Sequence, residues 1–251
     1  MVLAADEPGP AIVREGSPDC PFVLVADHAG NAIPRALGHL GLSEEDRTRH
    51  IAWDIGIARV ADTLAERLGA PLVRQRYSRL AIDCNRDPAR ADAIPEVSDG
   101  TEISGNIGLN KAGRTARIAG IHAPYHAAIA AALAEQRRPP IMVALHSFTP
   151  IMNGFARPWH AGVLHDLGDT RFSDAVLAGL RSRIDAPVGD NEPYAMDGID
   201  LTVPHHCYRA ELAYAEIEIR QDLIADAAGQ ECWADLLANV LTDSLASICS
   251  S

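Results

Sequence analysis

Two uninterrupted apolar runs, Pro21–Ala26 and Ile141–Leu145, most constrain what this chain can fold into. Runs of this length without polar alternation are typical of strands in a parallel sheet, which are buried on both faces. A histidine follows each run, His28 after the first and His146 after the second. Open α/β sheets carry their ligand sites at the carboxyl ends of the strands. We therefore predict an α/β fold with a mostly parallel sheet flanked by helices, in which these histidines mark the site.

The bulk properties of the chain narrow its domain organisation and its partners. A length of 251 residues suits one large domain, and we expect residues 21–251 to form it behind a Pro- and Gly-rich lead-in of residues 1–20. The net charge of −12 argues against nucleic acid and anionic membranes as partners. Five cysteines without a Cys-x-x-Cys pair predict reduced thiols and a cytoplasmic protein. A homo-oligomer is left open.

The stretch Tyr214–Asp222 reads as a strand with an unusual charged face. Alternation places Glu216, Glu218 and Arg220 on one face and three small or apolar side chains on the other. An ionised carboxylate inside a sheet is costly unless it is paired, bound to a metal or at the strand's end beside a cleft. One interpretation is an edge strand with a solvated face. The other is that one glutamate acts as a general base at a metal site.

Candidate metal ligands come from separate parts of the chain. Imidazole is a common ligand for Zn²⁺, so His28 and His146 are the first candidates. Asp54 lies near the expected start of a helix, where it either complements the helix dipole or supplies a metal carboxylate. His122 and His126 lie four residues apart across an expected helix break at Pro124, and packing explains them better than metal binding does.

An arginine-rich segment between residues 74 and 90 is the expected place for an anionic substrate. A planar guanidinium can hold a carboxylate through two parallel hydrogen bonds. The alternative is structural, with Arg79 and Arg86 paired to Asp83 and Asp87. A thiol mechanism through Cys84 is a further option, but no adjacent histidine would activate the sulfur.

Five short segments occur in an order that resembles one known family. They are Val-Ala-Asp-His28-Ala-Gly30, Trp53-Asp54, Ile82-Asp83-Cys-Asn85-Arg86, Leu145-His146-Ser147 and Ile217-Glu218-Ile-Arg220-Gln-Asp222. Together they resemble the N-formylglutamate amidohydrolase family over roughly residues 21–245. More distantly, the chain is similar to zinc carboxypeptidases and aspartoacylases. The resemblance implies a hydrolase domain like that of the zinc carboxypeptidases.

The resemblance also implies roles for single residues. Asn85 and Arg86 match the Asp-x-Asn-Arg segment that holds a substrate carboxylate, with His206 as a weaker second contact. Glu218 matches the catalytic base of a Glu-hydrophobic-Arg strand, and Glu216 on the same face is its competitor. Carboxypeptidases supply their first two metal ligands as His-x-x-Glu, but the chain has Asn31 at the acidic position.

Asp54 is therefore the expected second ligand, and His28, Asp54 and His146 would bind one Zn²⁺. By resemblance, the protein is a metal-dependent amidohydrolase whose substrate is a small anionic N-acyl amino acid such as N-formyl-L-glutamate. Arg79 and the metal would stabilise the oxyanion. Two alternatives remain open: a metallo-carboxypeptidase or deacylase that acts on a larger substrate, and a non-catalytic protein that binds a carboxylate on the same fold.

Overall fold

The two apolar runs form neighbouring parallel strands in the middle of a seven-stranded sheet. The computed structural model describes residues 1–249. The order of strands in the sheet is β1-β3-β2-β6-β11-β9-β10. Their bounds are Ala11–Arg14 (β1), Phe22–Ala26 (β2), Leu72–Gln75 (β3), Ile141–Phe148 (β6), Ala161–Leu164 (β9), Val188–Asp190 (β10) and Tyr214–Arg220 (β11).

The sheet is mixed but mostly parallel, as predicted. Strands β3, β2, β6 and β11 run parallel to one another, and β10 runs parallel to β9. Two pairs are antiparallel, β1 with β3 and β9 with β11. Part of the expected lead-in is thus an edge strand, because β1 pairs with β3 along its whole length.

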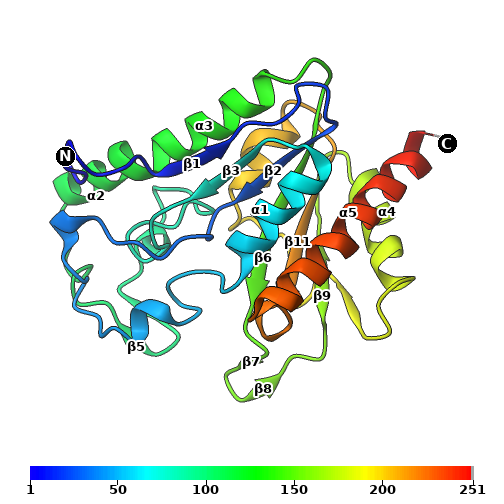
Figure 1. Cartoon of the computed structure of the whole chain (residues 1–251). Helices are drawn as coiled ribbons and strands as arrows, with labels where there is room; N and C mark the ends of the chain where they lie inside the picture. The colour runs from blue at the N-terminus through cyan, green and yellow to red at the C-terminus, as the bar shows by residue number, and fades with distance from the viewer. Residues whose placement is uncertain (250–251) are drawn as a thin grey trace.

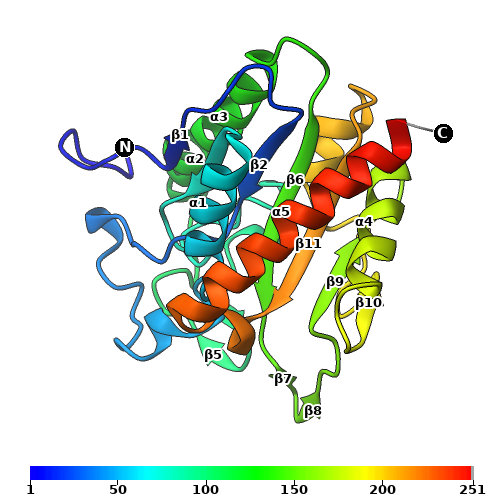
Figure 2. The same ribbon diagram turned by 45° about the vertical axis from the view of Figure 1, so that its right-hand side comes forward.

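Helices cover both faces of this sheet (Figures 1 and 2). One face carries α1 (Ile57–Leu68), α4 (Arg171–Arg181) and α5 (Ala227–Cys249), and the other carries α2 (Lys111–Arg117) and α3 (Ala123–Ala134). A π-helical turn at residues 118–122 joins α2 to α3 just before Pro124, so the helix changes its winding there but is not broken as expected.

Short elements complete the chain. Two small hairpins are formed by Val97–Ser98 (β4) with Thr101–Glu102 (β5), and by Ile151–Met152 (β7) with Phe155–Ala156 (β8). The β7–β8 hairpin extends beyond the end of the sheet at which β6 and β11 terminate (Figure 2). Single helical turns lie at Arg35–Leu37 (η1), Asp46–Thr48 (η2), Ala91–Ala93 (η3), Ile118–His122 (η4), Pro204–Tyr208 (η5) and Gln221–Ile224 (η6).

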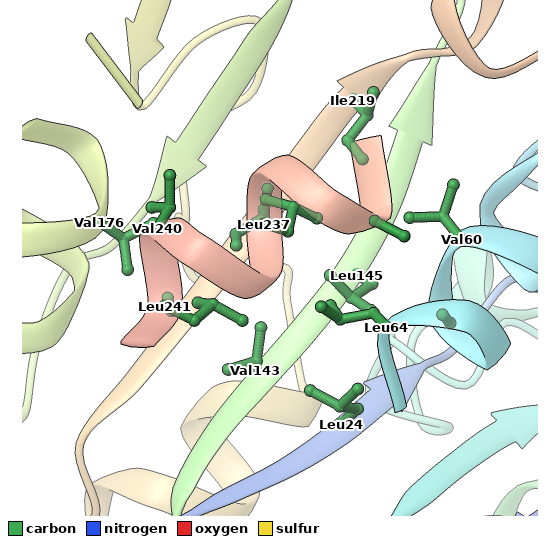
Figure 3. Packing of buried hydrophobic residues seen from close by; sticks show 14 of the residues in the cluster. Leu24, Val60, Leu64, Val143, Leu145, Val176, Ile219, Leu237, Val240 and Leu241 are labelled. Atoms are coloured by element: carbon green, nitrogen blue, oxygen red, sulfur yellow. The ribbon is translucent and has the colours of Figure 1, made fainter. Parts of the chain in front are cut away.

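The main core lies between the sheet and the layer of α1, α4 and α5. Figure 3 shows Leu237 and Leu241 of α5 directed at the strands that carry Val143 and Leu145. All four side chains are fully buried. Complete burial of one such side chain contributes about 1.5–3 kcal/mol, so this contact fixes α5 firmly on the sheet. Within residues 1–249, no helix combines the length and the apolarity that crossing a bilayer requires.

The acidic strand β11 lies inside the sheet, hydrogen-bonded to β6 on one side and β9 on the other. The edge-strand interpretation is therefore wrong. Ile217 and Ile219 enter the core against α5, while Glu216 and Glu218 face the opposite side and are buried. The alternation expected from the sequence is confirmed, and the strand carries two carboxylates into the protein.

Candidate active site

A cavity of about 540 Å³ opens at the carboxyl ends of the central parallel strands. His28 follows β2, His146 lies near the end of β6, and Glu218 lies near the end of β11. Asp54 reaches the cavity from the turn before α1, and all four side chains line it. The position agrees with the rule that open α/β sheets bind ligands at this edge.

The two histidines converge on one oxygen of Asp54. Nδ1 of His146 lies 3.0 Å from Asp54 Oδ2, and Nδ1 of His28 lies 3.6 Å from the same atom. The two imidazole rings meet edge to face with centroids 4.9 Å apart. One ligand atom from each of the three residues lies within 4.8 Å of the others. This buried group can hold a metal ion.

The remaining nitrogen of each ring faces a second carboxylate. Nε2 of His28 lies 2.7 Å from Asp83 Oδ1, and Nε2 of His146 lies 3.5 Å from Asp27 Oδ2. Histidines that ligate a metal usually give their other N–H to a carboxylate, which fixes the tautomer and the ring orientation. Nδ1 of His28 is buried and has no hydrogen-bonding partner within the described chain. The donor set therefore fits a small divalent cation.

The electrostatics of this group favour positive charge at its centre. Burial opposes protonation of His146, but the neighbouring carboxylates of Asp27, Asp54 and Glu216 outweigh it and raise the pKa of His146 well above its usual value. Burial also favours the neutral form of Asp54, yet His28 and His146 hold the pKa of that carboxyl low. The carboxylates around the two imidazoles thus favour positive charge at this position.

Asp54 is placed by backbone contacts and not by the first turn of a helix. Its N–H donates to the carbonyl of His28, and its Oδ2 accepts from the backbone N–H of Ser147. Helix α1 begins only at Ile57, after Gly56 with a φ of 85°. The first turn of α1 contains no acidic side chain, so the helix-dipole explanation of Asp54 is wrong.

Glu218 and Glu216 extend from β11 towards the same side of the sheet. Glu218 is paired in register with His146 of β6 and with Gly162 of β9. A side chain on Gly162 would collide with the carbonyl oxygen of Glu192, so glycine lets the 191–200 loop lie close to Glu218. Burial raises the pKa of each glutamate to about 8.

The two glutamates differ in what they face. Glu216 Oε1 lies 3.9 Å from Nε2 of His146, the ring nitrogen turned away from Asp54. Glu218 lies two residues nearer the carboxyl end of the strand, where the cavity opens, whereas the Oε2 atoms of both glutamates have no hydrogen-bonding partner within residues 1–249. Glu218 is therefore better placed than Glu216 to act on a molecule in the cavity.

The arginines that line the cavity already have carboxylate partners. Arg79 Nη2 donates to Asp83 Oδ2 at 2.7 Å, and Arg79 Nη1 lies 3.6 Å from Asp54 Oδ1. Arg86 Nη1 donates to Asp200 Oδ1 at 2.8 Å. The structural pairing considered for Arg79 and Asp83 is present, whereas Arg86 pairs with Asp200 in place of the expected Asp87.

His206 lies away from the cavity, behind the segment of residues 84–86. Its Nε2 lies 3.0 Å from His126 Nδ1, and His126 Nε2 lies 2.8 Å from the carbonyl oxygen of Cys84. His206 does not line the cavity, so its expected contact with substrate is corrected to a packing role beside His126. The Cys84 thiol is buried, which raises its pKa well above the usual value, and a thiol mechanism has no support.

Several residues at the site had no predicted role towards the histidines. Asp27 directly precedes His28, which was the available signal, and Asp83 was considered only as a partner of Arg79. Asp200 lies in a loop without hydrophobic periodicity, and the sequence there contains no signal for its role. Arg157, against the cavity-lining Tyr194, also went unnoticed, and its Nη1 lies 3.0 Å from the Tyr194 hydroxyl.

The fold and the site together define a hydrolase built on an α/β sheet, with its polar groups at the carboxyl ends of the parallel strands. The chain belongs to the N-formylglutamate amidohydrolase family, whose sequence profile matches residues 20–225. This confirms the family resemblance read from the five motifs. A comparison with curated protein sequences found no significant match.

Solved structures agree with this assignment. The gene product Atu2144 from Agrobacterium tumefaciens is 37% identical over 99% of both chains, with a TM-score of 0.94. The N-formylglutamate amidohydrolase from Ralstonia eutropha JMP134 is 19% identical, with a TM-score of 0.68 over 97% of this chain and 100% of that chain. The second likeness establishes the fold alone.

Proposed function

We propose that this protein is a metal-dependent amidohydrolase that cleaves the N-acyl amide of a small N-acyl amino acid. The observation that carries the proposal is the convergence of two imidazole Nδ1 atoms on one oxygen of Asp54, beside Glu218. The family supports hydrolysis of an amide. The cavity volume of about 540 Å³ lies in the range of small-molecule sites and favours a small substrate over a polypeptide.

His28, Asp54 and His146 would hold the ion, for which Zn²⁺ is our proposal because nitrogen and carboxylate ligands suit it. When bound, such an ion supplies a Lewis acid and makes water more acidic at neutral pH. Asp83 and Asp27 would keep the two imidazoles in the required orientation, since each carboxylate faces the ring nitrogen that does not point at Asp54.

Glu218 would act as the general base. Its carboxylate takes a proton from the water that attacks the acyl carbon, and it then delivers that proton to the leaving nitrogen. Burial keeps the pKa of Glu218 near 8 in the metal-free protein, and a nearby cation would lower it towards neutral pH. The products are a carboxylic acid and a free amine, so the atoms of water and amide balance.

Arg79 would stabilise the oxyanion that develops on the acyl oxygen. Two of its nitrogens, Nε and Nη2, hold Asp83, whereas Nη1 donates no hydrogen bond within the described chain. The pair with Asp83 fixes the guanidinium plane in advance, and a donor that needs no rearrangement is the effective kind in a buried site.

The test combines elemental analysis of the purified protein with formate release from N-formyl-L-glutamate and N-formyl-L-glutamine. We expect about one divalent ion per chain and hydrolysis of at least one compound. His146→Asn should lose both properties. His165→Asn is the matched control, because His165 pairs with Asp190 and does not line the cavity.

Bound zinc without hydrolysis of any N-acyl amino acid would support the proposed metal site but contradict the proposed reaction. Full activity in protein stripped of metal by a chelator would contradict metal dependence, whatever the substrate.

A further inference from the structure

Several arginines of this protein hold an aspartate through the same edge of the guanidinium. In each of them Nε and Nη2 both donate to one carboxylate, and the pairs are Arg74–Asp62, Arg79–Asp83, Arg90–Asp92, Arg171–Asp169 and Arg220–Asp222. This edge can bind a carboxylate through two parallel hydrogen bonds. An arginine beside a cavity whose Nε–Nη2 edge has no partner is therefore a candidate receptor for a carboxylate of the ligand.

Two arginines at the cavity leave this edge without a partner. Arg86 donates only from Nη1, to Asp200 Oδ1 and to the carbonyl group that precedes it in the chain. Arg157 also donates only from Nη1, to the carbonyl oxygen of Thr149 and to the hydroxyl oxygen of Tyr194. Nε and Nη2 of both arginines donate to no atom of residues 1–249, and none of these nitrogens is sealed from solvent.

Arg157 is a buried cation without a carboxylate partner. It is only 8% exposed, and within the described chain its polar partners are the two neutral oxygens at Nη1. A buried charge is costly unless it is paired. Arg117, the other buried arginine of residues 1–249, donates to three oxygens, those of Ala81, Gly105 and Asn106. Arg157 has fewer acceptors and an open edge, which favours a role in binding an anion.

Arg157 lies directly behind the cavity wall, although it is not itself part of the lining. Its guanidinium carbon lies 4.7 Å from the centre of the Tyr194 ring and 5.7 Å from the centre of the Phe148 ring. Both rings line the cavity, as does Thr149. Burial lowers the pKa of His50, another lining residue, and the charge of Arg157 is among those that lower it further. The field of Arg157 therefore reaches the cavity.

The Tyr194 hydroxyl connects Arg157 to the cavity. Because its oxygen accepts a hydrogen bond from Arg157, its own proton is free to donate to a ligand. Tyr194 is 40% exposed, and exposed side chains change rotamer within nanoseconds. A carboxylate in this part of the cavity would meet the hydroxyl proton first, and a turn of the ring would bring the carboxylate against the Nε–Nη2 edge of Arg157.

We propose that Arg157, together with Tyr194, receives the second carboxylate of an N-acyl derivative of a dicarboxylic amino acid, while Arg86 receives the first. The inference rests on the proposed amidohydrolase function and adds the residue that recognises the acidic side chain. N-formyl-L-glutamate carries two carboxylates, whereas N-formyl-L-glutamine has nearly the same size and carries one. The open edge of Arg157 therefore predicts selection of glutamate over glutamine.

The test measures kcat/KM of the metal-loaded full chain for N-formyl-L-glutamate and N-formyl-L-glutamine. We expect the wild-type protein to prefer glutamate by about 10–100-fold, the usual effect of a charged hydrogen-bonded pair. Arg157→Gln should bring the two values within about threefold of each other, mainly through a higher KM for glutamate, and leave the value for glutamine within about threefold of wild type. Arg157→Met, which fills the space between the two rings, replaces this variant if Arg157→Gln does not fold.

Arg220→Gln is the matched control. Arg220 Nη1 donates to the carbonyl oxygen of Arg157 at 3.3 Å, its Nε–Nη2 edge holds Asp222, and it does not line the cavity. The variant removes the same charge beside the same segment, and we expect it to change the glutamate-to-glutamine ratio by less than about threefold.

A binding measurement tests the same site without any reaction. In calorimetric titrations of the metal-loaded protein, L-glutamate should bind more tightly than L-glutamine to the wild type. The two should bind equally to Arg157→Gln, because the side-chain carboxylate has then lost its receptor.

Equal kcat/KM of the wild-type protein for the two formyl compounds would overturn the inference. An unchanged preference in Arg157→Gln would do the same, since the carboxylate would then be held elsewhere. An equal loss for both compounds would leave Arg157 only a structural tie between the base of the β7–β8 hairpin and the loop of Tyr194, and a shift as large in Arg220→Gln would reduce the effect to general charge. Hydrolysis of neither compound would contradict the amidohydrolase function, and the calorimetry would then decide on Arg157 by itself.

Discussion

Replacing Glu218 by glutamine tests the centre of the proposed mechanism. Glutamine keeps the size and polarity of the side chain but cannot accept a proton at neutral pH. A positioned general base contributes roughly 10²–10⁴ in rate, and each factor of ten corresponds to about 1.4 kcal/mol of barrier. The change should therefore lower kcat by 10²–10⁴ and raise the barrier by about 3–5 kcal/mol.

The position of Glu218 makes it the glutamate expected to carry this effect. Glu218 pairs in register with His146 near the carboxyl end of β11 and lines the cavity, whereas the buried Oε2 of each glutamate lacks a hydrogen-bonding partner within residues 1–249. Glu216→Gln is the matched control on the same face of β11. Glu216 contacts His146 at the nitrogen turned away from Asp54, and we expect its replacement to lower kcat by less than about tenfold.

The assay is the initial rate of formate release from whichever N-formyl amino acid the wild-type protein hydrolyses. Metal content is measured for every variant, so that loss of the ion is not mistaken for loss of the base. A Glu218→Gln protein with bound metal and nearly full activity would refute the assignment. If the Glu216→Gln protein were the inactive one, Glu216 would be the base.

Three further changes probe the metal site, the core and the buried acid. Asp83→Asn removes the carboxylate that orients His28 and should weaken metal affinity about 10–100-fold, measured by competition with a chelator. Leu237→Ala should lower the unfolding free energy by about 2–5 kcal/mol in urea titrations, and the partly buried Leu236→Ala by clearly less. Burial raises the pKa of Glu216 to about 8, so the folded metal-free protein keeps a proton that the unfolded chain releases. Its stability should therefore fall as pH rises from about 5 to 8, and melting curves of Glu216→Gln should depend less on pH across that range.

The central strands, and the meeting of the residues at their carboxyl ends, could be predicted from the sequence. Continuous apolar runs require burial on both faces, and this places β2 and β6 inside a parallel sheet. Once two such strands are neighbours, the residues that follow them meet, as His28 and His146 do. Alternation in β11 likewise fixed which side of the sheet carries Glu216 and Glu218.

The partners of loop residues could not be predicted in this way. Asp200 reaches Arg86 from a segment 114 positions away that has neither hydrophobic period nor motif. The direction in which His206 points depends on the packing of a single π-helical turn against α3, and sequence spacing carries no information on it. Both positions are set by tertiary contacts, and Asp200 occupies Arg86 Nη1 and Asn85 Nδ2 in the segment where an anion was expected to bind.

The alternation along β11 also makes the strand intolerant of misalignment. A shift of one residue against β6 and β9 would turn Ile217 and Ile219 into the cavity and drive Glu216 and Glu218 into the hydrocarbon beneath α5. Such a misregistered chain would move two acids from a polar cavity into an apolar layer that offers no hydrogen-bonding partner, and it would lose two aliphatic contacts at once. The two acids that face the cavity thus also disfavour the wrong register of β11 during folding, and so help to align the middle of the sheet.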